Sequence, residues 1–121
     1  MKTRPRHIES SIQRSIWQLY QLQYSRRFIM HAVPNGVQVG GAARAGAILK
    51  AMGTVAGAPD FAGVLPGGRA FYIEVKAPDG KLSPTQKEFR ERAIEFGADW
   101  HLVRGIGEFQ EWAERQRTGS R

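Results

Sequence analysis

Hydrophobic and polar residues alternate with a period of two along Arg69–Ala77, and this pattern predicts a β-strand. One face of the predicted strand is apolar and holds Phe71, Ile73 and Val75. The opposite face holds Tyr72, Glu74 and Lys76. Because side chains on the same face of a strand are neighbours, the acid and the amine should emerge side by side near the end of this strand.

A second predicted strand, Gly57–Leu65, precedes the first, and the Pro-Gly-Gly sequence at 66–68 predicts a hairpin turn between them. Asp60 follows Pro59 near the start of one strand, and Glu74 lies near the end of the other. Since the strands of a hairpin run antiparallel, we expect these two carboxylates to converge at one end of the sheet.

The remaining hydrophobic pattern predicts three more helices, two more strands and an amphipathic first helix that contains Glu9. The additional elements are a strand at Arg27–Val33, a helix at Ala42–Met52, a helix at Ser83–Phe96, a strand at Trp100–Val103 and a helix at Gly107–Arg117. The order αβαββαβα predicts an α/β fold with a mixed β-sheet flanked by helices. A length of 121 residues with 41% hydrophobic composition suits a single compact domain over residues 1–121.

The helix after the hairpin has a clear start signal, with Ser83 as N-cap, Pro84 in the first turn and Gln86 completing a capping box. Its inward stripe is predicted to hold Phe89, Ala93 and Phe96, and Gly97 should end it. Gln86 lies on the same stripe and could reach the converging carboxylates. Capping alone also explains Gln86, and spacing favours that simpler role.

Glu9 lies inside the apolar stripe of the first helix, among Ile8, Ile12 and Ile16. A carboxylate directed toward a core is costly unless it is paired or lies near a metal. Glu9 either forms an ion pair with Arg6 or Arg14 at the border of the stripe, or supports a site formed by the other carboxylates.

Two carboxylates held close together repel each other unless a divalent cation lies between them. Hard oxygen ligands select Mg²⁺ or Mn²⁺. Such an ion polarises a phosphate and activates water, while a neighbouring lysine such as Lys76 orients the water or stabilises the developing charge. The Glu-x-Lys triplet alone favours an exposed salt-bridged pair on an amphipathic strand. The Pro-Asp one hairpin away favours a metal-dependent nuclease.

These blocks together resemble the VRR-NUC domain, a branch of the PD-(D/E)xK nuclease superfamily. The resemblance spans about Glu9 to Trp112 and depends on the first-helix acid, Gly57-Ala58-Pro59-Asp60, Ile73-Glu74-Val75-Lys76, Leu82-Ser83-Pro84-Thr85-Gln86 and Trp100-His101-Leu102-Val103-Arg104. It implies a restriction-endonuclease-like core. It also implies Asp60, Glu74 and the Val75 carbonyl as metal ligands, Lys76 as the catalytic lysine, and Glu9 and Gln86 as supporting residues. Small stand-alone members look like phage or bacterial nucleases, and some resemble Holliday-junction resolvases.

The excess positive charge lies entirely in residues 1–59, which hold eight Lys or Arg and one acid, whereas residues 60–121 hold ten of each. Such a surface attracts DNA through phosphate contacts that read no sequence. The candidate DNA contacts are Arg4, Arg6, Arg26, Arg27 and Arg44.

The absence of cysteine excludes disulfides and thiolate metal sites, and no apolar signal core follows the basic N-terminus. A cytoplasmic location is therefore expected. Symmetric cutting of a four-way junction needs two active sites, so a homodimer is expected, with Phe109 and Trp112 as a possible surface unless they pack on the sheet. We expect an endonuclease for branched DNA; a loosely specific nicking or flap nuclease, or a catalytically silent DNA-binding module, are the alternatives.

Overall fold

The computed structural model describes residues 5–34 and 43–118, with side chains placed for 7–34 and 47–116. Four helices, one π-helical turn and four strands follow one another in these residues. They are α1 (Pro5–Leu19), η1 (Tyr20–Tyr24), β1 (Ile29–Ala32), α2 (Ala43–Ala51), β2 (Phe61–Val64), β3 (Ala70–Val75), α3 (Pro84–Glu95), β4 (Asp99–Val103) and α4 (Ile106–Thr118). The predicted order of helices and strands is confirmed, and the residues at which they begin and end differ from the predicted ones by a few positions. The first helix differs in a further way, because it continues into the π-helical turn.

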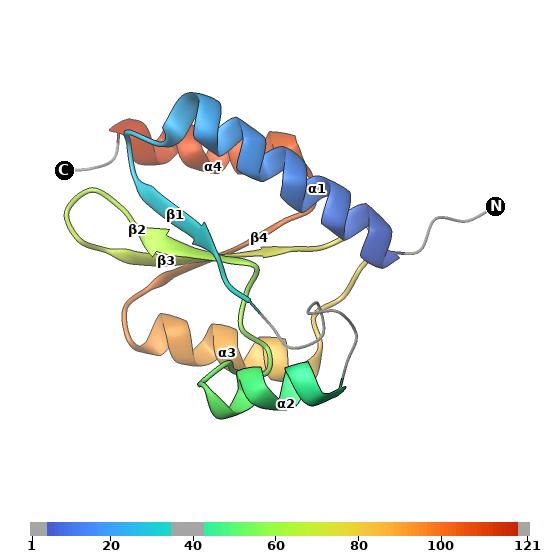
Figure 1. The fold of residues 1–121 in the computed structure, drawn as a ribbon. Helices are drawn as coiled ribbons and strands as arrows, with labels where there is room; N and C mark the ends of the chain where they lie inside the picture. Colours follow the sequence, from blue (N-terminus) through green and yellow to red (C-terminus); the bar gives the residue numbers. More distant parts are fainter. Residues whose placement is uncertain (1–4, 35–42, 119–121) are drawn as a thin grey trace.

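The strands form one mixed sheet in the order β1-β2-β3-β4. β1 pairs with β2 and β2 with β3 in antiparallel fashion, whereas β3 and β4 are parallel and are joined through α3. α1 and α4 cover one face of the sheet, and α3 and α2 lie on the other (Figure 1). The expected mixed sheet flanked by helices is therefore confirmed.

The main core lies between the sheet and the layer of α1 and α4. Phe71, Ile73 and Val75 are buried there, so the predicted apolar face of β3 is correct. Trp112 of α4 packs against Phe71 with ring centroids 4.9 Å apart and against Phe28 at 5.4 Å. On the opposite face of β3, the Tyr72 ring meets the edge of Phe89 of α3 at 5.1 Å. The two faces of β3 thus anchor it to both helical layers.

One prediction about an aromatic residue is wrong, and the structure decides between the two alternatives for two others. Phe96 is not on the inward stripe of α3 but is 75% exposed, because the helix ends there and Gly97, at φ 94°, turns the chain away. Phe109 and Trp112 offer no dimer surface, because they are 0% and 2% exposed and belong to the core. They pack against the sheet, which was the alternative left open by the sequence.

Gly57 is required where the chain enters β2. Its φ is +83°, and a Cβ atom built there would lie 2.3 Å from the carbonyl oxygen of Thr85. The absence of a side chain lets the segment before Asp60 pack directly against the first turn of α3. That close approach brings the start of β2 next to the helix that carries Gln86.

The Gly57→Ala variant should therefore lose more stability than a glycine substitution that is strained but has open space. Gly67 is a matched control, since its φ is +91° and a Cβ there meets nothing within 4 Å. We expect Gly57→Ala to unfold with a free energy about 1–3 kcal/mol lower than Gly67→Ala, because of backbone overpacking. Chemical denaturation of both variants measures this difference, and equal losses would contradict the proposed role of the contact.

Candidate metal centre

The structure brings Asp60 and Glu74 together, as the hairpin predicted. Asp60 immediately precedes β2, and its N–H donates to the carbonyl of Ile73 at 3.1 Å. In return, the N–H of Val75 donates to Asp60 Oδ2 at 2.7 Å. These reciprocal bonds fix the Asp60 carboxylate beside the Glu74–Val75 segment at the end of β3.

Glu74 is the one buried charged residue of the described core, at 4% exposure. Gln86 Nε2 donates to its Oε2 at 3.2 Å. Its Oε1 is buried and has no hydrogen-bond partner among the described residues. A buried carboxylate oxygen without a donor is costly, so this atom requires either a proton or a cation.

Burial raises the pKa of both carboxyl groups. For Asp60, burial is the largest cause, and it raises the pKa although the hydrogen bond from the Val75 N–H lowers it. Burial, followed by the negative charge of Asp60, raises the pKa of Glu74 to about 9. A hydrogen bond from protonated Glu74 to Asp60 acts in the same direction on Glu74. Without a cation, the pair therefore retains a proton at neutral pH.

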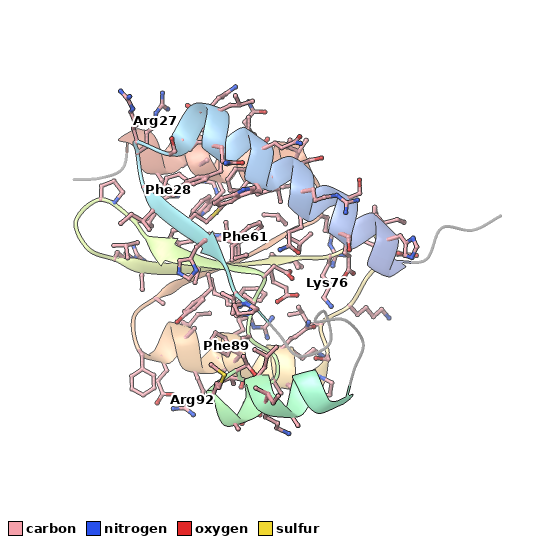
Figure 2. The ribbon with its side chains drawn as sticks, viewed as in Figure 1. Arg27, Phe28, Phe61, Lys76, Phe89 and Arg92 are labelled. Carbon is pink, nitrogen blue, oxygen red and sulfur yellow. The ribbon has the colours of Figure 1, made fainter. Side chains whose placement is uncertain are left out.

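Lys76 directly follows β3, and its backbone N–H extends the parallel pairing by donating to Val103 at 3.0 Å. Its positive charge lowers the pKa of Asp60 and of Glu74, so the ammonium group lies within electrostatic reach of both. Figure 2 shows Lys76 near one end of the sheet, below α1. The expected grouping of two carboxylates and one lysine is present.

Glu9 reaches the same region from α1. Its Oε2 accepts a hydrogen bond from the N–H of Ala77 at 3.1 Å, and its negative charge raises the pKa of both Asp60 and Glu74. Within the described side chains it forms no ion pair with Arg14, whereas the Arg6 side chain lies outside them. Glu9 thus contacts the segment that follows Lys76.

Gln86 has both of the roles that the sequence left open. Its N–H donates to Ser83 Oγ at 3.2 Å, and its Oε1 accepts from the Ser83 N–H at 2.8 Å, which completes the capping box. The Nε2 atom of the same amide points to Glu74. Capping therefore fixes the amide in the orientation that contacts the buried carboxylate.

The donor atoms fit a hard divalent cation. Asp60 and Glu74 supply carboxylate oxygens, and the Val75 carbonyl oxygen is a third candidate ligand. Glu74 Oε1, which has no hydrogen-bond partner among the described residues, is the oxygen most in need of a positive charge. In the part of the chain that the structure describes, no three or more His, Cys, Asp or Glu side chains gather as a metal site. An ion bound here would therefore depend on water and phosphate oxygens for its remaining ligands.

Of the five candidate DNA contacts, only Arg26 and Arg27 have side chains that the structure describes. Arg27 Nη1 lies 3.9 Å from Glu114 Oε2, and the Arg27 guanidinium carbon lies 5.5 Å from the centre of the Tyr24 ring. In Figure 2, Arg27 lies well apart from Lys76. Arg26 precedes it and is exposed. Arg4 lies outside the described residues, as do the side chains of Arg6 and Arg44.

Arg104 is a residue at this site that sequence reasoning missed. It follows β4, and its Nη1 contacts the carbonyl oxygens of Ala77, Pro78 and Gly80 at 2.7, 3.1 and 2.8 Å. A basic residue at the end of a strand is a weak signal alone. It becomes informative only when β4 is known to lie parallel to β3.

Comparison with known proteins gives the family and the fold of this chain. The family model of the VRR-NUC domain matches residues 8–106. A solved structure of a VRR-NUC domain protein superimposes with a TM-score of 0.67 at 21% sequence identity, covering 89% of this chain and 86% of that chain. No curated protein matches the sequence. The fold is thus an α/β restriction-endonuclease-like core.

The stability of the metal-free protein should depend on the protonation of Glu74. Because the folded state raises this pKa to about 9, it binds the proton more tightly than the unfolded chain does. The stabilising contribution is complete below the unfolded pKa of about 4.3 and is lost as the pH rises toward the folded pKa.

In the presence of a chelator, the melting temperature of the wild-type protein should therefore fall as the pH rises from about 5 to 9. The melting temperature of Glu74→Gln should fall less over the same range. Glu88→Gln removes an exposed carboxylate of α3 and serves as the control. Melting curves recorded at intervals of pH measure the effect. Parallel curves for wild type and Glu74→Gln would show that burial of Glu74 does not control the pH dependence.

Proposed function

The chain belongs to the VRR-NUC family of nuclease domains, and we propose that it is a Mg²⁺- or Mn²⁺-dependent endonuclease that hydrolyses DNA phosphodiester bonds. The main support is the buried Glu74 carboxylate, which lies beside Asp60 with one oxygen lacking a partner. Two partly buried acids are costly to hold together unless a cation binds between them.

Asp60, Glu74 and the Val75 carbonyl are the proposed ligands of the ion. When bound, a hard divalent cation supplies charge stabilisation for the phosphate and lowers the pKa of water. The protein contributes a fixed arrangement of its own groups. The Val75 N–H holds Asp60 through Oδ2, and Gln86 holds Glu74 through Oε2, so Glu74 Oε1 remains available.

Lys76 is the proposed catalytic lysine. Its ammonium group lies close enough to both carboxyls to lower their pKa values, and it can donate hydrogen bonds but accept none. It is therefore suited to orient an attacking water or to stabilise negative charge on a phosphate oxygen. Glu9 and Gln86 are proposed as supporting residues, since each contacts the segment or the carboxylate beside Lys76.

DNA is the proposed substrate, and the net charge of +7 favours a polyanion. We further propose a single domain over residues 1–121, a preference for branched DNA such as a four-way junction, and action as a homodimer. These proposals depend on the family resemblance and on the two symmetric cuts that resolution requires. Burial of Phe109 and Trp112 leaves the dimer surface unassigned.

The metal ligands can be tested with Asp60→Asn and Glu74→Gln. Each should lower cleavage by more than about a hundredfold while DNA binding is retained or tightened, because a negative charge near the phosphate is removed. Labelled junction, flap and linear DNA are incubated with Mg²⁺ or with EDTA, and Glu88→Gln is the control. Cleavage by Asp60→Asn or Glu74→Gln at the wild-type rate would refute the assignment.

Lys76→Ala should also be inactive, but calorimetry should show that this variant still binds Mn²⁺, because the Lys76 amine is not a ligand. Loss of metal binding in Lys76→Ala would mean a different role for Lys76.

Glu9→Gln keeps an acceptor for the Ala77 N–H and removes only the charge. A loss in cleavage rate of about tenfold or more, without a change in melting temperature, is therefore expected. Unchanged activity of Glu9→Gln would mean that Glu9 is only a structural contact.

Assembly is tested by light scattering at micromolar protein, with and without junction DNA. A twofold dimer in either condition is expected if both strands of a junction are cut together. A monomer in both conditions would remove the resolvase proposal and leave a nicking or flap nuclease. DNA binding without cleavage of any substrate in Mg²⁺ or Mn²⁺ would instead indicate a silent DNA-binding module.

A further inference from the structure

The turn after Lys76 is held by contacts from two distant parts of the chain. Residues 77–80 connect β3 toward α3, and the Gly80 N–H closes the turn on the Ala77 carbonyl at 2.9 Å. Glu9 of α1 accepts the Ala77 N–H, and Arg104 donates to three carbonyls of the turn. Both polar backbone groups of Ala77, which is fully buried, are thereby satisfied.

Arg104 is itself fixed on the opposite side. Its backbone N–H donates to Glu108 Oε1 at 2.7 Å, in the first turn of α4. Val103, the residue before it, accepts the Lys76 N–H at 3.0 Å. The ends of the parallel strands β3 and β4 are therefore joined twice, once by the backbone at Lys76 and once by the guanidinium of Arg104.

An arginine suits this position because a guanidinium only donates hydrogen bonds and remains charged at all working pH values. Nη1 carries two hydrogens. The two shortest contacts, to Ala77 and Gly80, can each take one of them, and the longer contact to Pro78 shares. One guanidinium group thus donates hydrogen bonds to three carbonyl oxygens of the same turn.

We propose that Arg104 is a positioning residue that holds the 77–80 turn and thereby fixes Lys76 beside Asp60 and Glu74. The inference rests on the proposed nuclease function. Lys76 lies between two peptide groups, and the first is anchored by Val103 and the second by Glu9. Loss of the Arg104 contacts leaves the second peptide held by Glu9 alone, without the ordered turn that follows it, and the ammonium group then samples orientations away from the carboxylates. In this proposal Arg104 acts through Lys76, because its guanidinium contacts the carbonyls of the turn.

The test compares wild type with Arg104→Met, which keeps a long apolar side chain but loses the carbonyl contacts, and with Arg104→Lys. For Arg104→Met, kcat on labelled DNA should fall about tenfold or more, while KM and the calorimetric affinity for Mn²⁺ change little. Arg104→Lys retains a cationic donor and should recover most of the lost rate. Arg90→Met is the matched control. The Arg90 guanidinium carbon lies 5.7 Å from the centre of the Trp100 ring, and Arg90 does not belong to the contacts of the turn.

Amide hydrogen exchange provides a readout that does not depend on cleavage. In Arg104→Met, the Ala77 and Gly80 amides should exchange about tenfold faster or more, while the Asp60 amide, bonded to Ile73, keeps its wild-type rate. The Arg90→Met control should leave all three amides unchanged.

Three results would overturn the proposal. They are unchanged exchange at Ala77 and Gly80, an unchanged kcat and KM in Arg104→Met, or an unchanged kcat with a raised KM, which would make Arg104 a DNA contact. A wild-type protein that cleaves no DNA would refute the proposed nuclease function and with it the effect on Lys76. The exchange rates would still decide separately whether Arg104 holds the turn.

Discussion

The buried carboxylate of Glu74 is the constraint around which this end of the molecule is organised. A charged group at 4% exposure would be excluded from most cores, and here it lies next to a second acid and lacks a partner for one oxygen. Its pKa of about 9 expresses that cost. The hydrogen bonds from Val75 and Gln86 orient the two carboxyl groups but leave Glu74 Oε1 without a donor among the described residues.

The architecture delivers each group to this point from a different element. The hairpin of β2 and β3 sets Asp60 against Glu74, Gly57 allows α3 to approach, and the capping box of α3 then directs Gln86 inward. The layer of α1 and α4 contributes Glu9 on one side and anchors Arg104 on the other. Because α1, α4, β2 and β3 also share the aromatic core around Trp112, stability and site geometry are linked.

No described helix is long and apolar enough to cross a membrane. Of the candidate DNA contacts, only Arg26 and Arg27 have described side chains, and Arg27 lies near Glu114, apart from Lys76 (Figure 2). A path for DNA toward the proposed site would therefore have to include residues other than these two. Charge counting predicted a polyanionic partner but not its route, because composition carries no information about which face of the fold a basic residue occupies.

The sequence by itself determined the order of the elements and the meeting of Asp60 with Glu74, because strand periodicity and hairpin geometry are local and leave few alternatives. It also predicted the start of α3 from its capping residues. Local patterns failed for Phe96, where the helix ended, and left Phe109 and Trp112 undecided between surface and core. Only the tertiary structure showed that Glu9 binds the Ala77 N–H and that Arg104 gathers the carbonyls of the 77–80 turn. Those contacts join residues separated by 68 and 27 positions, and such pairs depend on how the layers pack, which no local pattern encodes.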